Sequence, residues 1–162
     1  MKGRRRYALG IDPGTCFCGY ALVEAAGPST FEPVELGTIV LPESDPIHKR
    51  LGRLLRELSP IVERAKEVRA DGAVEEPMVF GSHASTIGIA SARGVCIALL
   101  GAAGLRFSQY KPNVWRKVTG NGYSDKIRTA YIVQTILRLK QTPALDAAEA
   151  GAIALYHLTL DP

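Results

Sequence analysis

The chain has 162 residues, 46% of them hydrophobic and 22% charged, with a formal net charge of +4 and a pI of about 9.1. This composition is typical of a globular chain with one core, and we expect no apolar run long enough to span a bilayer. The apolar run behind the basic residues Lys2 to Arg6 stops at Asp12, too soon for a signal peptide, so we expect a cytoplasmic protein without a membrane partner.

The first part of the chain is predicted to form strands. Apolar residues between turn residues predict strands at 7–11, 19–24 and 34–41. Asp45-Pro46 then opens a helix, because apolar residues recur at helical spacing from Ile47 to Val62.

The remaining predicted elements alternate between helix and strand. In chain order they are a strand at 72–74 that ends at Glu75-Glu76-Pro77, a buried helix at 82–103, a strand at 105–110, a short helix from Pro112, a turn at 119–122, a helix from its cap Ser124 to about 139, and a helix from 142 to about 160. This order predicts an α/β fold, with a mixed five-stranded sheet and helices on both faces. We expect one domain, 1–162, in which 1–6 form a basic N-terminal arm.

The cysteines do not match the pattern of a metal site. Cys16 and Cys18 have a C-x-C spacing, and no cluster of His or Cys elsewhere completes a zinc site. Together with Cys96 they make an odd number, so a disulfide framework is not expected. We interpret all three as reduced, small residues, with Cys16 and Cys18 in the turn after the first strand.

Four acids could share one site instead. Asp12 ends the first strand, and Glu75 or Glu76 ends the fourth. Asp146 and Glu149 are three residues apart on one face of the last helix, whose Ala and Gly residues would let it lie close to the sheet. Converging carboxylates repel one another unless cations neutralise them, and oxygen ligands favour Mg²⁺ or Mn²⁺. Two such ions could hydrolyse a phosphodiester. The alternatives are an Asp that only forms a turn and a D-x-x-E pair on a solvated face.

Basic and aromatic residues follow the fifth strand and suit a nucleic-acid backbone. They are Lys111, Trp115, Arg116, Lys117, Lys126 and Arg128, with the turn Thr119-Gly120-Asn121-Gly122 among them. The mildly basic net charge agrees with such a partner without establishing it. The alternative is a solvated pair of helices with one core tryptophan. His48, His83 and His157 are not assigned to the site.

Taken together, these segments resemble the RuvC family of Holliday junction resolvases, the crossover junction endodeoxyribonucleases. The segments that carry the resemblance are LGIDPGTCFCGYALVE, AVEEP, SARGV, KVTGNGYSDK and DAAEAGAIALYH, in that order along nearly the whole chain. The resemblance implies an RNase H-like fold and a homodimer that nicks a four-way DNA junction symmetrically, with two Mg²⁺ ions per site that Mn²⁺ could replace. It also implies that Asp12, Glu75, Asp146 and Glu149 hold the metals and that Lys126 lies near the scissile phosphate.

Three departures from the family pattern concern substrate and metal preference. The fourth acid is usually Asp, but here it is Glu149, which is one methylene longer. The family's wedge aromatic has no direct match, and Phe80 is the displaced candidate. A basic residue of the family falls near Trp115, next to Arg116 and Lys117. The family's sequence preference at the junction is therefore not carried over to this chain. A complex with branch-migration proteins is not assumed either.

Three alternative functions are open. The first is a nuclease of the same fold that cuts other branched DNA, and the second is a junction-binding protein that has lost catalysis. The third is a phosphate-binding fragment of the actin-like ATPase class, which needs two such domains around a nucleotide.

Overall fold

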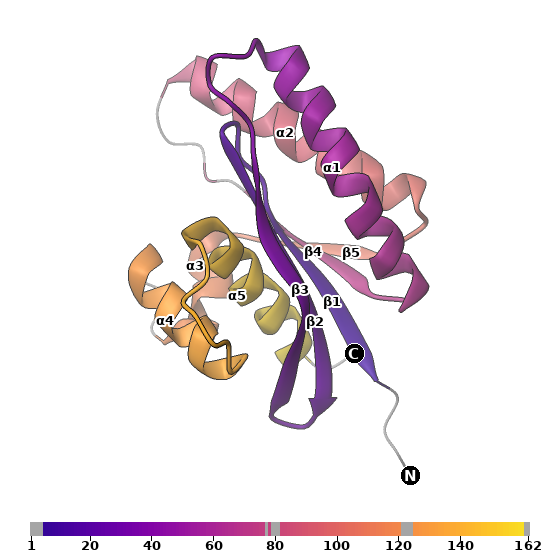
Figure 1. Cartoon of the computed structure of the whole chain (residues 1–162), viewed down its shortest axis with the longest axis vertical. Coiled ribbons are helices and arrows are strands. Elements are labelled where there is room, and N and C mark those ends of the chain that lie inside the picture. The colour runs from indigo at the N-terminus through magenta and orange to yellow at the C-terminus, as the bar shows by residue number, and fades with distance from the viewer. Residues whose placement is uncertain (1–4, 77, 79–81, 121–124, 161–162) are drawn as a thin grey trace.

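A five-stranded sheet separates two helical layers (Figure 1). The computed structural model describes residues 5–76, 78, 82–120 and 125–160. The strands are β1 (Arg6–Asp12), β2 (Phe17–Gly27), β3 (Thr30–Val40), β4 (Asp71–Glu75) and β5 (Phe107–Tyr110). The helices are α1 (Ile47–Glu67), α2 (His83–Ala102), α3 (Pro112–Trp115), the 3₁₀ helix η1 (Arg116–Thr119), α4 (Lys126–Ile136) and α5 (Leu145–Thr159). The predicted mixed sheet with helices on both faces is confirmed.

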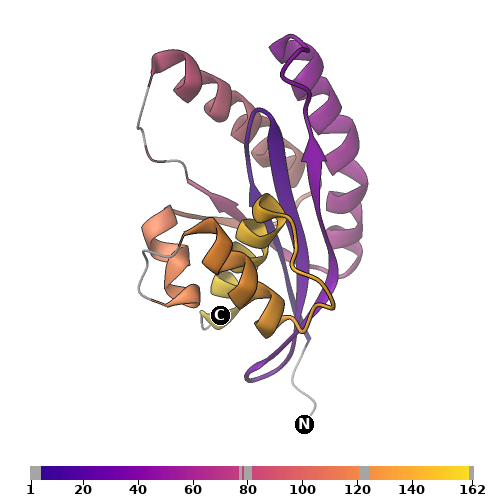
Figure 2. The same ribbon diagram turned by 60° about the vertical axis from the view of Figure 1, so that its left-hand side comes forward.

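The strand order is β3-β2-β1-β4-β5, so the central strand β1 has a different kind of neighbour on each side. It pairs antiparallel with β2 and parallel with β4. Side chains of successive residues in a strand point to opposite faces. Leu9 and Ile11 therefore pack in the core under α1 and α2, whereas Ala8 packs in the core under α4 and α5. Figure 2 shows these two helical layers from the side.

Glycines let α5 lie directly on the strands that carry the first acid. A Cβ built at Gly10 of β1 would overlap the carbonyl oxygen of Ala150, and one built at Gly19 of β2 would overlap that of Asp146. Gly19 is the pairing partner of Asp12 in the β1–β2 ladder. The close approach that the Ala- and Gly-rich sequence predicts is therefore present, and it carries the start of α5 to the end of β1.

Helix α2 differs from its prediction as a buried helix. Of its described residues, only Ala92, Cys96 and Leu100 are buried, and Ile87 is 66% exposed. By length and composition alone α2 could cross a membrane, a criterion that core helices of soluble proteins also meet. The expectation that no apolar segment reaches that length is therefore wrong.

Several predicted boundaries also need correction. Cys18 lies in β2 and is fully buried in the core, so only Cys16 belongs to the turn after β1. The three cysteines are free thiols. The cap of α4 is Asp125, whose side chain accepts a hydrogen bond from the backbone N–H of Arg128. The predicted cap Ser124 lies outside the described residues.

Candidate metal and DNA site

Three carboxylates converge where β1 ends and α5 begins. Oxygen atoms of Asp12, Asp146 and Glu149 all lie within 4.8 Å of one another. Asp12 and Glu149 are buried, with exposed fractions of 8% and 3%, and Asp146 is half-buried in the first turn of α5. The N-terminal end of a helix favours a negative charge, which helps α5 to hold Asp146 there.

Glu75 stands beside this cluster and is held by a tryptophan. The indole Nε1 of Trp115 donates a hydrogen bond of 2.8 Å to Oε2 of Glu75. Trp115 is fully buried in the core that α5 covers. Glu75 belongs to the same electrostatic group as the three acids, since its charge raises the pKa of Asp12. The structure thus places the predicted acids at one end of the sheet, with Glu75 bound to an indole and outside the three-acid cluster.

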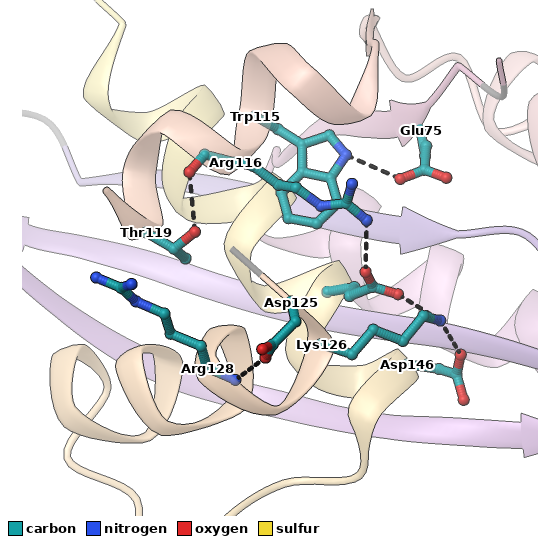
Figure 3. A network of polar contacts seen from close by, with 9 residues as sticks. Glu75, Trp115, Arg116, Thr119, Asp125, Lys126, Arg128 and Asp146 are labelled. Atoms are coloured by element: carbon teal, nitrogen blue, oxygen red, sulfur yellow. Dashed lines mark hydrogen bonds and ion pairs between the residues drawn. The ribbon is translucent and has the colours of Figure 1, made fainter. Parts of the chain in front are cut away.

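Two cations pair with acids of the cluster and offset part of its charge (Figure 3). Lys126 Nζ lies 2.8 Å from Oε2 of Glu149 and 3.5 Å from Oδ1 of Asp146. Arg116 Nη2 lies 3.2 Å from the other carboxylate oxygen of Glu149, and its guanidinium lies over the Trp115 ring, 4.9 Å from the ring centroid. Both oxygens of a nearly buried carboxylate therefore carry a cationic partner, as a buried charge requires.

Burial and the neighbouring charges shift the pKa of three groups. Burial, reinforced by the charges of Glu75 and Glu149, raises the pKa of Asp12 well above its ordinary value. Burial also raises the pKa of Glu75, against the lowering effect of the Trp115 hydrogen bond. Burial alone would lower the pKa of Lys126, but its bond to Glu149 and the charges of the other acids outweigh that effect and raise it.

This donor set suits a hard divalent cation. The clustered ligands are all carboxylate oxygens, the type that Mg²⁺ and Mn²⁺ prefer. Burial is the main cause of the raised pKa of Asp12, and the charges of Glu75 and Glu149 raise it further despite the two cations. A divalent cation would relieve that repulsion, so the residues fit a metal site. The cysteines take no part in it.

The predicted DNA-contacting residues divide into two groups. Lys111, Lys117 and Arg128 are exposed, and Arg116 and Lys126 are partly exposed at the acids. The prediction that Trp115 contacts DNA is wrong, because its ring is buried in the core and cannot stack on a base. Phe80, the candidate wedge, lies outside the described residues, as do Asn121 and Gly122 of the predicted turn.

The supporting roles of Trp115 and Arg116 were not predicted from the sequence. Consecutive residues bind acids on two different elements, Glu75 at the end of β4 and Glu149 on α5. Both residues have helical backbone angles, so their side chains point about 100° apart around the helix and reach different partners. The only signal in the sequence was the place of Trp115 beside basic residues, which equally suited a core tryptophan or a base-stacking one.

Comparison with known proteins agrees with this geometry. The family model described as crossover junction endodeoxyribonuclease RuvC matches residues 8–157. A RuvC of Halorhodospira halophila is 35% identical over 152 residues, which cover 92% of this chain and 87% of that protein. A RuvC of Chloroflexus aggregans is 37% identical over 158 residues, which cover 96% of this chain and 94% of that protein.

Solved structures share the same architecture. RuvC of Thermus thermophilus matches with a TM-score of 0.78 at 26% identity, over 94% of this chain and 93% of that one. The structure of T. thermophilus RuvC in complex with a Holliday junction substrate gives a TM-score of 0.82 at 24% identity, with the same coverage of both chains. The expected RNase H-like fold is confirmed by these matches.

Proposed function

The chain belongs to the RuvC family of crossover junction endodeoxyribonucleases, and from that premise we propose that it cuts four-way DNA junctions by metal-dependent hydrolysis of a phosphodiester bond. The observation that carries the proposal is the cluster of Asp12, Asp146 and Glu149 beside Lys126. A nuclease without carboxylates at this position would have nothing to hold a catalytic metal. Metal-dependent cutting of a synthetic junction, lost in Asp12→Asn, is the direct test.

We propose that Asp12, Asp146, Glu149 and Glu75 hold two Mg²⁺ ions, which Mn²⁺ could replace. When bound, such ions supply an activated water and stabilise the leaving oxygen. The chain's own contribution is to fix the acids on a strand end and a helix, which are rigid supports. Trp115 and Arg116 orient two of the four carboxylates through their side-chain contacts.

Lys126 has the best position for the scissile phosphate. Its side chain is 51% exposed and its Nζ lies between Asp146 and Glu149, so one face of the ammonium is open to a substrate. The Asp125 cap fixes the first turn of α4, where Lys126 begins the helix. Lys111, Lys117, Arg128 and the partly exposed Arg116 would contact the DNA backbone around it, because arginine and lysine bind phosphates without regard to sequence.

A homodimer through α2 would supply the two sites that symmetric nicking needs. The outer face of α2 exposes Ile87 and leaves open space where a Cβ would stand at Gly94 and Gly101. Small residues on an apolar face allow the backbone of a second helix to approach closely. The other candidate, α1, buries its apolar stripe in its own core through residues such as Leu54 and Leu58. This contrast favours α2.

The remaining elements of the proposal follow from the family. We propose one nuclease domain over 1–162 that acts in the cytoplasm, with the beginning of the chain as a basic arm. Arg6 is the first residue of β1, which limits that arm to the residues before it. Because Glu149 departs from the family's usual Asp, two alternatives stand beside this proposal, the cutting of other branched DNA and junction binding without cutting. The junction-cutting experiment distinguishes both from it. Binding to branch-migration proteins is not part of the proposal.

A further inference from the structure

A second concave surface lies beside the edge strand β5, where β1 begins and α5 ends. This hollow has a volume of about 720 Å³. Four arginines from three separate parts of the chain line it, Arg5, Arg6, Arg69 and Arg106, together with Tyr110 and His157. It does not include any of the four acids of the metal site. Asp12, Asp146 and Glu149 lie at the other ends of β1 and α5, and Glu75 ends β4, where it pairs with Tyr110.

The hollow carries an excess of positive charge. Asp71 is the one acid among its lining residues in the described part of the chain, and Arg106 already pairs with it at 3.0 Å. Arg5 pairs with Glu24 at 3.2 Å, outside the lining. The Arg106 and Arg5 side chains are 88% and 75% exposed, and ion pairs this exposed contribute little. Both guanidinium groups therefore remain available to an incoming anion.

Two of the arginines are fixed by the backbone. Arg6 donates hydrogen bonds to the carbonyl oxygens of Leu158 and Leu160, at 3.4 and 3.1 Å, and so lies against the end of α5. Arg69 has a φ of 57°, a left-handed conformation that glycine adopts at lower cost. Arginine at this position costs about 1 kcal/mol in backbone strain.

A chain of polar contacts within the hollow occupies Asp71, the one acid among its described lining residues. The Tyr110 hydroxyl lies 2.7 Å from Nδ1 of His157, and Nε2 of His157 lies 3.5 Å from Asp71. Burial lowers the pKa of His157, so the imidazole is neutral at neutral pH. Asp71 thus has partners in both His157 and Arg106, which weakens its repulsion of an anion. Arginine forks are donors that suit phosphate oxygens well.

The position of the hollow fits the substrate. His157 follows Glu149 by eight residues of α5, which is about 12 Å along the helix. Arg6 precedes Asp12 by six residues of β1, which is about 20 Å. Phosphates on one strand of a duplex recur every 3.4 Å along its axis. In a DNA arm whose cut site lies at the acids, the phosphates about four to six nucleotides from the cut would therefore lie about 12–20 Å away.

We propose that this hollow binds backbone phosphates of a duplex arm of the junction, about 12–20 Å from the cut. The inference rests on the proposed function and extends it, because it gives the enzyme a contact that depends on an arm and not on the junction centre. The contact is with phosphates, so it would add affinity without sequence preference.

The test combines changes in the protein with changes in the DNA, as in a double-mutant cycle. The affinity of each protein for each junction is measured by fluorescence anisotropy in EDTA over a range of salt concentrations. The hollow variant is Arg69→Gln with Arg106→Gln, and each single change is also measured. The control variant, Lys49→Gln with Arg56→Gln, removes the same charge from exposed positions on α1. Two junctions are compared, one normal and one with neutral methylphosphonates at four to six steps from the cut.

The wild-type and control proteins should bind the methylphosphonate junction about tenfold more weakly than the normal one, with a salt slope smaller by about 1–2, since each phosphate contact contributes about 0.9. The hollow variant should already show the reduced salt slope on the normal junction. Its affinity for the methylphosphonate junction should equal its affinity for the normal one. Equal slopes for the hollow and control variants would overturn the proposal.

Two further outcomes separate this inference from its alternatives. Binding of inorganic phosphate or a mononucleotide that Arg69→Gln abolishes, without any change in junction binding, would show a small-anion site and overturn the arm contact. A protein that cuts no junction in any metal, yet shows the difference between hollow and control variants, would remove the proposed function and leave the arm contact standing.

Discussion

The indole of Trp115 binds the carboxylate of Glu75 through a hydrogen bond of 2.8 Å, and this bond sets where the acid of β4 stands relative to the other three. Glu75 lies outside the group formed by Asp12, Asp146 and Glu149. Because Trp115 is fully buried, its ring has one orientation, and the carboxylate that it binds is held accordingly. The site therefore depends on a core residue that does not itself reach the substrate.

Trp115→Phe should lower kcat for junction cutting with little change in KM. The substitution keeps an aromatic ring in the core and removes the donor to Glu75. A hydrogen bond to a charged group contributes about 1.5–3 kcal/mol, which corresponds to a loss of about 10–100-fold if the bond persists in the transition state. Val133→Ala, a loss of packing in the same core away from the acids, is the control. Equal kcat values for the two variants would contradict this role.

Arg116→Gln should destabilise the metal-free protein by about 1–3 kcal/mol, because it leaves one oxygen of a buried carboxylate without its cation. Added Mg²⁺ should restore more stability to this variant than to the wild type, since the metal replaces the missing charge. Thermal melting with and without metal measures both effects. Lys117→Gln removes a charge from the exposed neighbouring residue and should melt like the wild type; a similar loss in both variants would rule out a specific bond to Glu149.

The sequence was sufficient to predict the positions of the acids but not of the groups that support them. Asp12 and Glu75 follow apolar strands, and Asp146 and Glu149 share a helix face, so local periodicity placed them correctly. Arg116 and Trp115 act through contacts with acids 33 and 40 residues away in the sequence. No local residue periodicity encodes such contacts.

The exposure of α2 and the burial of Cys18 were missed for related reasons. An apolar helix has the same composition whether its own chain or a second copy covers it, so its sequence predicted burial that the single chain does not provide. The sequence pattern starts the second strand at Gly19 and therefore leaves Cys18 in the turn. In the structure β2 begins two residues earlier, at Phe17, and includes Cys18. Strand ends depend on pairing with distant residues, here Val40 of β3, which a local pattern does not contain.

Asp12→Asn should stabilise the metal-free protein at neutral pH. Burial raises the pKa of Asp12 in the folded state above 3.8, so the folded protein binds a proton more tightly than the unfolded chain does. The cost of ionising Asp12 therefore appears as the pH rises above 3.8 and is complete above the raised pKa, at about 1.4 kcal/mol for each unit of the shift.

The difference in stability between Asp12→Asn and the wild type should accordingly grow from pH 4 to neutral pH in EDTA, as measured by denaturant unfolding. Asp45→Asn, in the loop before α1, serves as the control and should show no such trend. A variant less stable than the wild type at neutral pH would mean that the attraction between Asp12 and the charge of Lys126 outweighs the burial and repulsion of Asp12.

Ile87→Lys should convert the protein to a monomer at micromolar concentration in sedimentation velocity, because it places a charge on the exposed apolar face of α2. Leu55→Lys makes the same change on α1, where Leu55 is 46% exposed, and should leave the dimer intact. A dimer in Ile87→Lys together with a monomer in Leu55→Lys would assign the dimer contact to α1. A wild-type monomer under these conditions would contradict symmetric nicking.

The most direct measurement is the cutting of a labelled four-way junction, a matched duplex and a flap in Mg²⁺, Mn²⁺ and EDTA, by the wild type and Asp12→Asn. We predict paired symmetric nicks in the junction alone, with either metal, and none with EDTA or with Asp12→Asn. Equal cutting of the flap would keep the metal chemistry and reject the junction specificity. Selective junction binding with no cutting in either metal would contradict the central claim that these acids form a catalytic site.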